Sequence, residues 1–245
     1  MRTAMRPFGR AADLDLDFGQ SDRPGLVTAV LAQCAADDAD ADAWWSRTVG
    51  TRTAALLSLL AVTDASAQVG FTARCGAAGC GELFGFDLPL QALATQASLD
   101  DAAVRVALDP ARSVHLRRPT GADLRDWHVR RPATRSEAVR TMLDALLVEG
   151  TVDLEDEARL SQAIVALDPL VDFSVHCHCP ACGASSDVAI DLEALALGRL
   201  HARQQGLLRD VHRLASRYGW TEAQVLAVPP ARRARYLALV DEEGR

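Results

Sequence analysis

Two half-similar segments of this 245-residue chain, about a hundred residues apart, contain five of its six cysteines. The first begins at Val69 and reads VGFTARCGAAGCGELFGFDLPLQAL, and the second begins at Val171 and reads VDFSVHCHCPACGASSDVAIDLEAL. Aligned without gaps, they match at Val69/Val171, Phe71/Phe173, Cys75/Cys177, Cys80/Cys182 and Gly81/Gly183. Cys-Gly turns between alternating strands predict two copies of one zinc-knuckle β-hairpin.

The cysteine spacing indicates one structural zinc site shared by both hairpins. Structural zinc is held by four thiolate or imidazole ligands, at about 2.3 Å for sulfur. The predicted ligand set is Cys75, Cys80, Cys179 and Cys182. Cys177 is the alternative to Cys179, because the ungapped alignment pairs it with Cys75, and His176 and His178 are the nearest further donors. Because the two pairs are distant in sequence, metal binding would be coupled strongly to folding.

Two other interpretations of these cysteines remain open. They could be reduced, partly buried thiols without a metal, or Cys179 and Cys182 could form a redox-active CxxC pair. A redox pair is expected at the N-terminus of a helix that follows a strand, whereas strands are predicted on both sides of this one. Cys34, the sixth cysteine, lies in an apolar helical pattern and is predicted to be a core residue.

The sequence lacks the motifs of common catalytic sites. There is no H-E-x-x-H and no H-x-E paired with P-C-x-x-C, and a site of four thiolates is the closed, structural kind. A P-loop, a G-x-G-x-x-G loop and a G-x-S-x-G elbow are also absent from the sequence. We therefore predict a protein that is not an enzyme and has no small-molecule substrate.

The composition favours a mainly helical core. Apolar residues make up 49% of the chain but aromatic residues only 5%, so Ala and Leu dominate the core and favour helices. The predicted fold is α+β, mainly helical, with two pseudo-repeated zinc-knuckle β-hairpins, at about 68–90 and 170–192, sharing one metal site. Residues 1–24 are expected to form an N-terminal arm, mobile or added as a strand to a partner. A helical and zinc-hairpin domain follows at 25–198, and a C-terminal helical interaction segment at 199–245.

Periodicity and capping signals place the other elements. Helices are predicted to begin at Pro24, Trp44, Ser136, Leu154 and Glu193, and a further hairpin over Val104–Leu108 and Ser113–Leu116. The helix from Trp44 is expected to continue unbroken to Val62, and Leu147 is expected to extend the apolar stripe of the helix from Ser136. Capping signals are predicted at Thr120, Asp123, Gly219, Thr221 and Gln224.

Charge and targeting signals limit the partners and the compartment. The formal net charge is −7, and no strand interleaves basic and aromatic residues, so nucleic acid is not an expected partner. No stretch approaches the roughly 20 apolar residues that a membrane span needs. No apolar region follows the basic N-terminus, so no signal peptide is predicted. The expected location is the cytoplasm, where paired cysteines bind metal more often than they form disulfides.

The C-terminal segment contains a predicted partner-binding surface. It combines aromatic residues with arginines, the residue types that are enriched as anchors in protein interfaces. The arginines are expected on the exposed side of a final helix from Ala231 to Val240. The predicted partner-binding residues are Tyr218, Trp220, Arg232, Arg233, Arg235 and Tyr236.

The order of these motifs resembles that of one known family. Residues 209–240 read RDVHRLASRYGWTEAQVLAVPPARRARYLALV, which resembles a recurrent C-terminal signature of phage-tail-like gene clusters. Before it come a helix with TRTAALL from Thr51, the first cysteine hairpin, HLRRPTGADL from His115, a helical middle and the CPxCG hairpin. From about residue 25 onward, the chain is similar to the T4-type bacteriophage baseplate protein family of contractile tails and contractile injection systems.

This resemblance implies a role in building a baseplate or hub. The chain would be a baseplate component or an assembly factor, and its partners would be other baseplate, hub or tail proteins. One feature departs from the family, because relatives tend to have CPxCG in both hairpins, whereas the first hairpin here has CGAAGCG. The alternative functions are a zinc-ribbon adaptor that binds nucleic acid and a CxxC thiol-redox protein.

Overall fold

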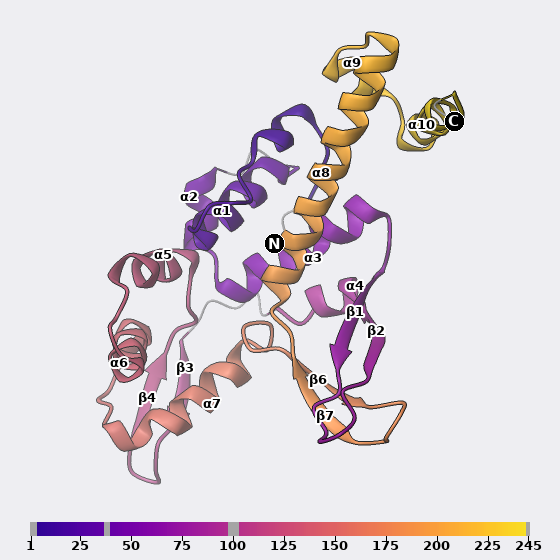
Figure 1. Cartoon of the computed structure of the whole chain (residues 1–245). Coiled ribbons are helices and arrows are strands. Elements are labelled where there is room, and N and C mark those ends of the chain that lie inside the picture. The colour runs from indigo at the N-terminus through magenta and orange to yellow at the C-terminus, as the bar shows by residue number, and fades with distance from the viewer. Residues whose placement is uncertain (1–3, 37–39, 98–102, 244–245) are drawn as a thin grey trace.

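The computed structural model describes residues 4–36, 40–97 and 103–243, and there the chain is a mixed α/β structure (Figure 1). The helices are α1 (Arg23–Cys34), α2 (Ala41–Ser46), α3 (Val49–Asp64), α4 (Leu90–Ala94), α5 (Gly121–Arg130), α6 (Arg135–Leu146), α7 (Glu157–Leu167), α8 (Leu192–Tyr218), α9 (Glu222–Ala227) and α10 (Pro230–Glu243), with 3₁₀ turns η1 (Ala11–Asp15) and η2 (Leu154–Asp156). The strands are β1 (Gln68–Arg74), β2 (Leu83–Pro89), β3 (Val104–Ala107), β4 (Ser113–Leu116), β5 (Leu147–Glu149), β6 (Ser174–His178) and β7 (Ser185–Ala189). They form the antiparallel sheets β1-β2, β3-β4-β5 and β6-β7. The prediction of helices combined with small antiparallel hairpins is confirmed.

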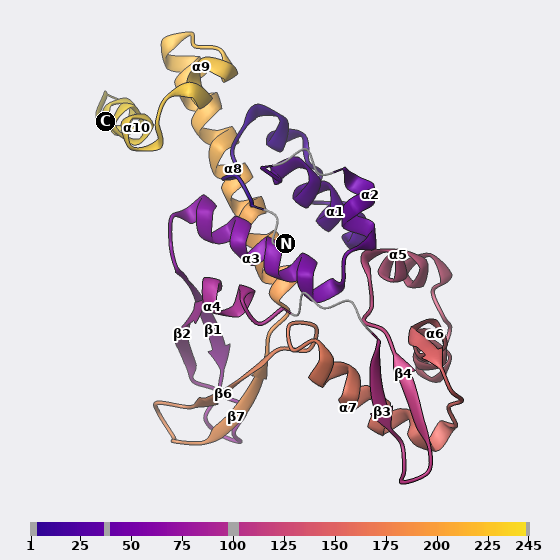
Figure 2. The same cartoon turned by 180° about the vertical axis from the view of Figure 1, so that it is seen from behind.

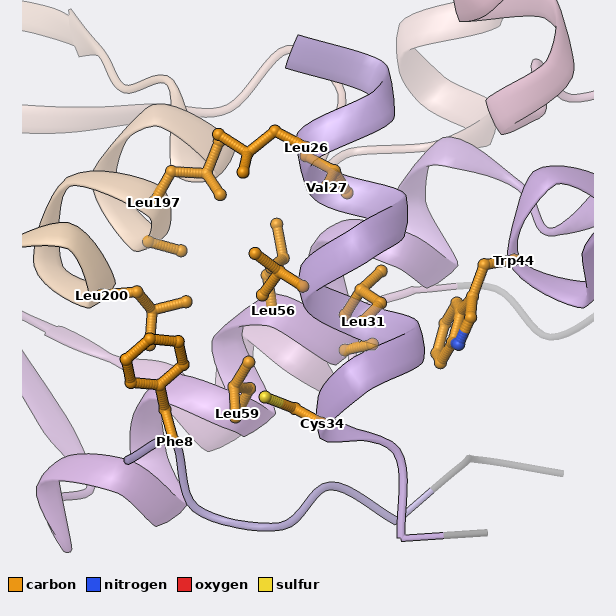
Figure 3. Close-up of a cluster of buried hydrophobic side chains, with 13 residues drawn as sticks. Phe8, Leu26, Val27, Leu31, Cys34, Trp44, Leu56, Leu59, Leu197 and Leu200 are labelled. Atoms are coloured by element: carbon orange, nitrogen blue, oxygen red, sulfur yellow. The ribbon is translucent and has the colours of Figure 1, made fainter. Parts of the chain in front are cut away.

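A central core forms where α1, α3 and α8 pack together (Figure 3). α3 can occupy the middle of this core because its sequence is apolar on most sides, and its Leu56 and Leu59 are fully buried. α8 contributes Leu197 and Leu200 from its first half. Figure 3 also labels Leu26, Val27 and Leu31 of α1, Trp44 of α2, and Phe8. Cys34 lies in this cluster as predicted, and burial raises the pKa of its thiol to about 12.

The N-terminal segment packs against this core, whereas the sequence predicts an N-terminal arm over residues 1–24, mobile or added as a strand to a partner. Phe8 is only 3% exposed and belongs to the central cluster. Asp13 is fully buried, and its carboxylate accepts hydrogen bonds of 2.6 and 2.8 Å from Arg6. Gln204 of α8 donates to three backbone carbonyls of the same segment. Polar contacts of this kind leave no periodic signal in the sequence. The first three residues lie outside the described part of the chain.

The helix predicted from Trp44 to Val62 is wrong, because the chain turns at Arg47 and Thr48 and forms α2 and α3 instead. Thr48 has extended backbone angles, and its hydroxyl accepts a hydrogen bond from the N–H of Thr51, so it caps the first turn of α3. Thr48 also forms a β-bridge with Thr120 at the start of α5. The apolar pattern on both sides of the turn concealed this cap.

The two cysteine-containing hairpins lie beneath α3 and the start of α8 in the view of Figure 1, and Figure 2 shows the same arrangement from behind. They share a second core with α3 and α4. The first hairpin contributes Val69 and Leu88, and Leu170 and Ile190 flank the strands of the second. Each hairpin is followed almost directly by a helix, α4 after β2 and α8 after β7. The hairpins are therefore anchored at the ends remote from their cysteine turns.

The sheet β3-β4-β5 forms a third packing unit with α6 and α7. Its buried core consists of Leu108, Val114, Leu116, Leu143 and Leu160. Leu147 was expected in a helix, but it caps α6 and begins β5, where it lies opposite Leu116. Its side chain still packs on the same core. An apolar residue at this position suits either a longer helix or the start of a strand, so the spacing of apolar residues alone does not distinguish the two.

The predicted capping residues adopt the expected geometry. Thr120 and Asp123 form a reciprocal capping box at the start of α5, and Thr221 with Gln224 does the same for α9. Gly219 follows α8 with φ of 68°, in the left-handed conformation that a glycine adopts without strain. These three predictions are confirmed, because capping depends on a few local residues.

Candidate metal centre

The first cysteine of each hairpin turn lies directly after a strand. Cys75 follows β1, and Cys179 follows β6. The N–H of Cys75 donates to the carbonyl of Glu82 at 2.8 Å, and the N–H of Cys179 donates to the carbonyl of Ala184 at 2.9 Å. Both turns are thus closed by the same kind of backbone hydrogen bond, which fixes the position of the first thiol.

The second cysteine of each turn precedes a glycine in the left-handed region. Gly81 after Cys80 has φ of 66°, and Gly183 after Cys182 has φ of 72°. A residue with a Cβ would be strained there. The glycines allow the chain to reverse sharply, so that both thiols of a turn face the same side.

These positions correct the ungapped alignment, because Cys75 corresponds to Cys179 in the backbone and not to Cys177. The first turn has four residues between its cysteines and the second has two. When the second cysteines are aligned without gaps, the strands before the two turns are therefore offset by two residues. Side chains alternate with a period of two along a strand, so this displacement leaves the apolar pattern intact and concealed the error. The thiol of Cys177 donates to the carbonyl of Val175 at 3.5 Å and lies outside the cysteine group.

The four predicted cysteines come together at the point where the two hairpin turns meet. The Sγ atoms of Cys75 and Cys182 are 3.7 Å apart, and those of Cys80 and Cys179 are 3.8 Å apart. All four Sγ atoms lie within 4.8 Å of one another, and all four cysteines are free of disulfides. A tetrahedral ion with sulfur ligands at about 2.3 Å requires sulfur separations of about 3.8 Å. This cluster could therefore hold a metal ion.

The turn backbone and the neighbouring thiols both shift the pKa values of the clustered cysteines. The backbone N–H groups of Cys182 and Ala181 lower the pKa of the Cys179 thiol to about 7. The N–H of Glu82 lowers the pKa of Cys80, but the thiol of Cys182 and burial outweigh it and raise that pKa to about 12. Four adjacent thiols therefore resist losing all of their protons together. A bound cation would reverse that preference, since metal-bound thiols are deprotonated.

Two arginines that the sequence analysis missed hold the first hairpin in place. Arg74, the last residue of β1, donates to the carbonyl of Gly81 at 2.7 Å and so braces the cysteine turn. Arg199 of α8 donates to the carbonyl of Gly70 at 2.8 Å and ties β1 to the long helix. The position of Arg74 next to Cys75 was the available signal, whereas the contact of Arg199 depends on tertiary structure.

The histidines proposed as further donors lie outside the cysteine group. His176 is exposed, and its Nδ1 is 2.8 Å from a carboxylate oxygen of Asp187 on the neighbouring strand. His178 is also exposed and packs edge-on against His176. Both side chains lie on the face of β6 opposite Cys177. They were proposed as donors only because they are close to the cysteines in the sequence.

The aromatic part of the predicted partner surface forms one cluster. The ring centroids of Tyr218 and Trp220 are 5.0 Å apart, and Tyr236 of α10 packs edge-on against both, at 5.9 and 5.1 Å. The cluster fixes α10 against the end of α8. Tyr218 remains 36% exposed, so part of this cluster is open to solvent.

The arginines of α10 divide into two groups. Arg232 and Arg235 are exposed, as predicted. Arg233 is only 5% exposed, and its Nε lies 3.3 Å from the carboxylate of Asp210 on α8. The prediction that Arg233 lies on the exposed face is therefore wrong. Adjacent residues of a helix are about 100° of rotation apart. Arg232 and Arg233 therefore lie on different sides of α10, and the side with Arg233 packs on α8.

The fold and the cysteine cluster define a mixed α/β protein with a candidate four-thiolate metal site. No family model matches the chain, and no curated protein or solved structure matches it. Within the described residues, none of the helices has the length and apolar content needed to cross a bilayer. The membership of the baseplate family stays a prediction from the motif order.

Proposed function

We propose that this chain is a non-enzymatic structural protein whose two hairpins are joined by one zinc ion. The observation that carries the proposal is the meeting of four free thiols from two hairpins within 4.8 Å. Soft thiolates in a tetrahedral arrangement favour zinc over harder cations such as magnesium or calcium. Four protein ligands would also fill the coordination sphere and leave no position for a reacting water. The arrangement thus favours a structural role over a catalytic one.

We further propose that the protein acts in a phage-tail-like contractile injection system, as a baseplate component or as a factor that assembles the baseplate or hub. The motif order from the helix at Thr51 to the YGWTE segment supports this assignment. The aromatic cluster around Tyr236 and the exposed Arg232 and Arg235 provide a surface suited to a protein partner. The partner would be another baseplate, hub or tail protein.

Metal analysis of the purified full-length chain tests the structural part of the proposal. We expect one equivalent of zinc per chain by elemental mass spectrometry. Removal of that zinc with a chelator should increase amide hydrogen exchange in β1, β2, β6 and β7, while the β3-β4-β5 sheet, which has its own core, stays protected. A chain without bound metal, or unchanged exchange after chelation, would refute the zinc site.

Quantitative mass spectrometry of assembled particles from the native host tests the biological part. A fixed ratio of this chain to sheath and spike proteins would identify a baseplate component. Absence from the particles, with failed assembly after deletion of the gene, would identify an assembly factor. Absence together with normal assembly would exclude the injection-system role and leave the zinc site unaffected.

A further inference from the structure

A basic cavity lies beside the C-terminal helices, and its lining includes none of the four clustered cysteines. It has a volume of about 440 Å³ and is lined by the N-terminal segment, the end of α3, the middle of α8, and parts of α9 and α10. In Figure 1, α10 and the end of α3 lie on the same side of α8. The polar lining includes four arginines, Arg6, Arg10, Arg203 and Arg233. Segments from both ends of the chain thus bring four guanidinium groups around one opening.

Two of these arginines are neutralised within the chain and two are not. Arg6 forms an ion pair of 2.6 Å with the buried carboxylate of the N-terminal segment, and Arg233 lies 3.3 Å from Asp210. Neither Arg10 nor Arg203 forms an ion pair with another described residue. The cavity therefore has an excess of about two positive charges.

Arg203 contributes a hydrogen-bond donor to this cavity that the described part of the chain leaves unsatisfied. Its Nε is buried but has no hydrogen-bond partner in the described part of the chain. A buried donor without a partner destabilises the fold, because its hydration is lost without replacement. Arg203 also acts on Arg233, whose pKa is lowered by burial and further by the positive charge of Arg203. Two like charges and an unused donor in one cavity indicate a site for an anion.

We propose that this cavity binds a phosphate group, inorganic or in a monoester, with Arg203 and Arg10 as its main ligands. A phosphate monoester carries about −1.5 to −2 charges at neutral pH, which matches the two uncompensated arginines. A single carboxylate would leave one of them unmatched. The planar guanidinium group donates two parallel hydrogen bonds to phosphate oxygens. Val62, which is exposed, and Leu226 also line the cavity and provide an apolar surface for the organic part of a monoester.

Titration of the full-length protein with inorganic phosphate tests this site. At constant ionic strength, we expect saturable binding by calorimetry and a higher melting temperature, because a ligand of the native state stabilises it. Arg203→Gln and Arg10→Gln should each weaken binding at least tenfold. Arg232→Gln is the matched control, since it removes the same charge from the exposed face of α10 and should leave binding unchanged.

Arg10 is exposed, so Arg10→Gln provides a test even if Arg203→Gln fails to fold. Phenyl phosphate distinguishes the two sources of the group. Tighter binding of phenyl phosphate than of inorganic phosphate would identify a monoester as the ligand, and equal binding would identify free phosphate. Absence of saturable binding of either probe, or equal affinities in the wild type and Arg10→Gln, would overturn the proposal.

Discussion

The Sγ atoms of Cys75 and Cys182 lie 3.7 Å apart although 107 residues separate them in the sequence. The other close sulfur pair, Cys80 and Cys179, also joins one hairpin to the other. Both of these close sulfur contacts therefore cross the junction between the two hairpins. An ion bound here would link two distant parts of the chain, and its binding free energy would contribute to folding.

Replacement of Cys182 by Ser should remove the bound metal and lower the melting temperature by about 10 °C or more, the scale expected when a metal site is lost. Elemental analysis and calorimetry of the purified variant measure both effects. Cys177→Ser is the matched control, because Cys177 lies two residues from a predicted ligand but outside the cluster. Retained metal and an unchanged melting curve in Cys182→Ser would exclude this ligand set.

The sequence predicts the hairpins, most helices and the four clustered cysteines because their signals are local. Strand alternation, Cys-Gly turns and capping boxes each depend on a few neighbouring residues. The break at Thr48 was missed because apolar residues continue on both sides of it. The correspondence of Cys75 with Cys179 was missed because a displacement of two residues preserves strand alternation.

Other features depend on tertiary contacts that a single sequence does not specify. Arg233 belongs to a basic run that is typical of a solvated helix face, yet the position of α8 buries it against Asp210. Asp13 lies in the segment that was predicted to form an N-terminal arm, yet it is fully buried. In each case a paired charge replaces the apolar residue that a pattern-based prediction expects in the interior.

Gly121 and the buried Arg52 of α3 provide a test of packing between α3 and α5. A Cβ at Gly121 would lie 1.7 Å from a guanidinium nitrogen of Arg52, which is fully buried. Gly121→Ala should therefore destabilise the protein by about 1–3 kcal/mol, the range for overpacking, as measured by denaturant unfolding. Gly198→Ala in α8 meets nothing within 4 Å and should instead stabilise it by about 0.5–1 kcal/mol. Equal effects of the two changes would contradict the buried position of Arg52.

Asp13 is expected to contribute to the acid sensitivity of the fold. Burial tends to raise the pKa of its carboxyl, but hydrogen bonds from Arg6 and from the N–H groups of Gly9 and Arg10 outweigh burial and hold that pKa below its ordinary value. This contribution to stability is complete above the ordinary Asp pKa of about 3.9 and is lost as the pH falls through the lowered value.

Asp13→Asn should therefore lower the free energy of unfolding by about 3 kcal/mol at pH 7, since it leaves the partly buried Arg6 without its carboxylate partner. The difference from the wild type should shrink as the pH falls below about 4. Denaturant unfolding at several pH values measures this, with the exposed Asp15→Asn as control. A difference that is independent of pH would show that the carboxylate charge is not the cause.

The same substitution should affect stability differently at the two adjacent arginines of α10. Arg233→Ala removes a buried partner of Asp210 and should destabilise the protein by about 2 kcal/mol. Arg232→Ala changes an exposed side chain and should alter stability by less than about 0.5 kcal/mol. In a binding assay with a partner, only Arg232→Ala would report on the interface alone. Equal thermal stability of both variants would contradict the burial of Arg233.

The single helix α8 connects the cysteine hairpins to the aromatic cluster without a break over 27 residues. At 1.5 Å per residue it extends about 40 Å, so it can act as a lever. A tilt of roughly 10° at the hairpin end would displace the far end by about 7 Å. The ligation state of four thiols at one end of the molecule would then determine where the surface at the other end meets its partner.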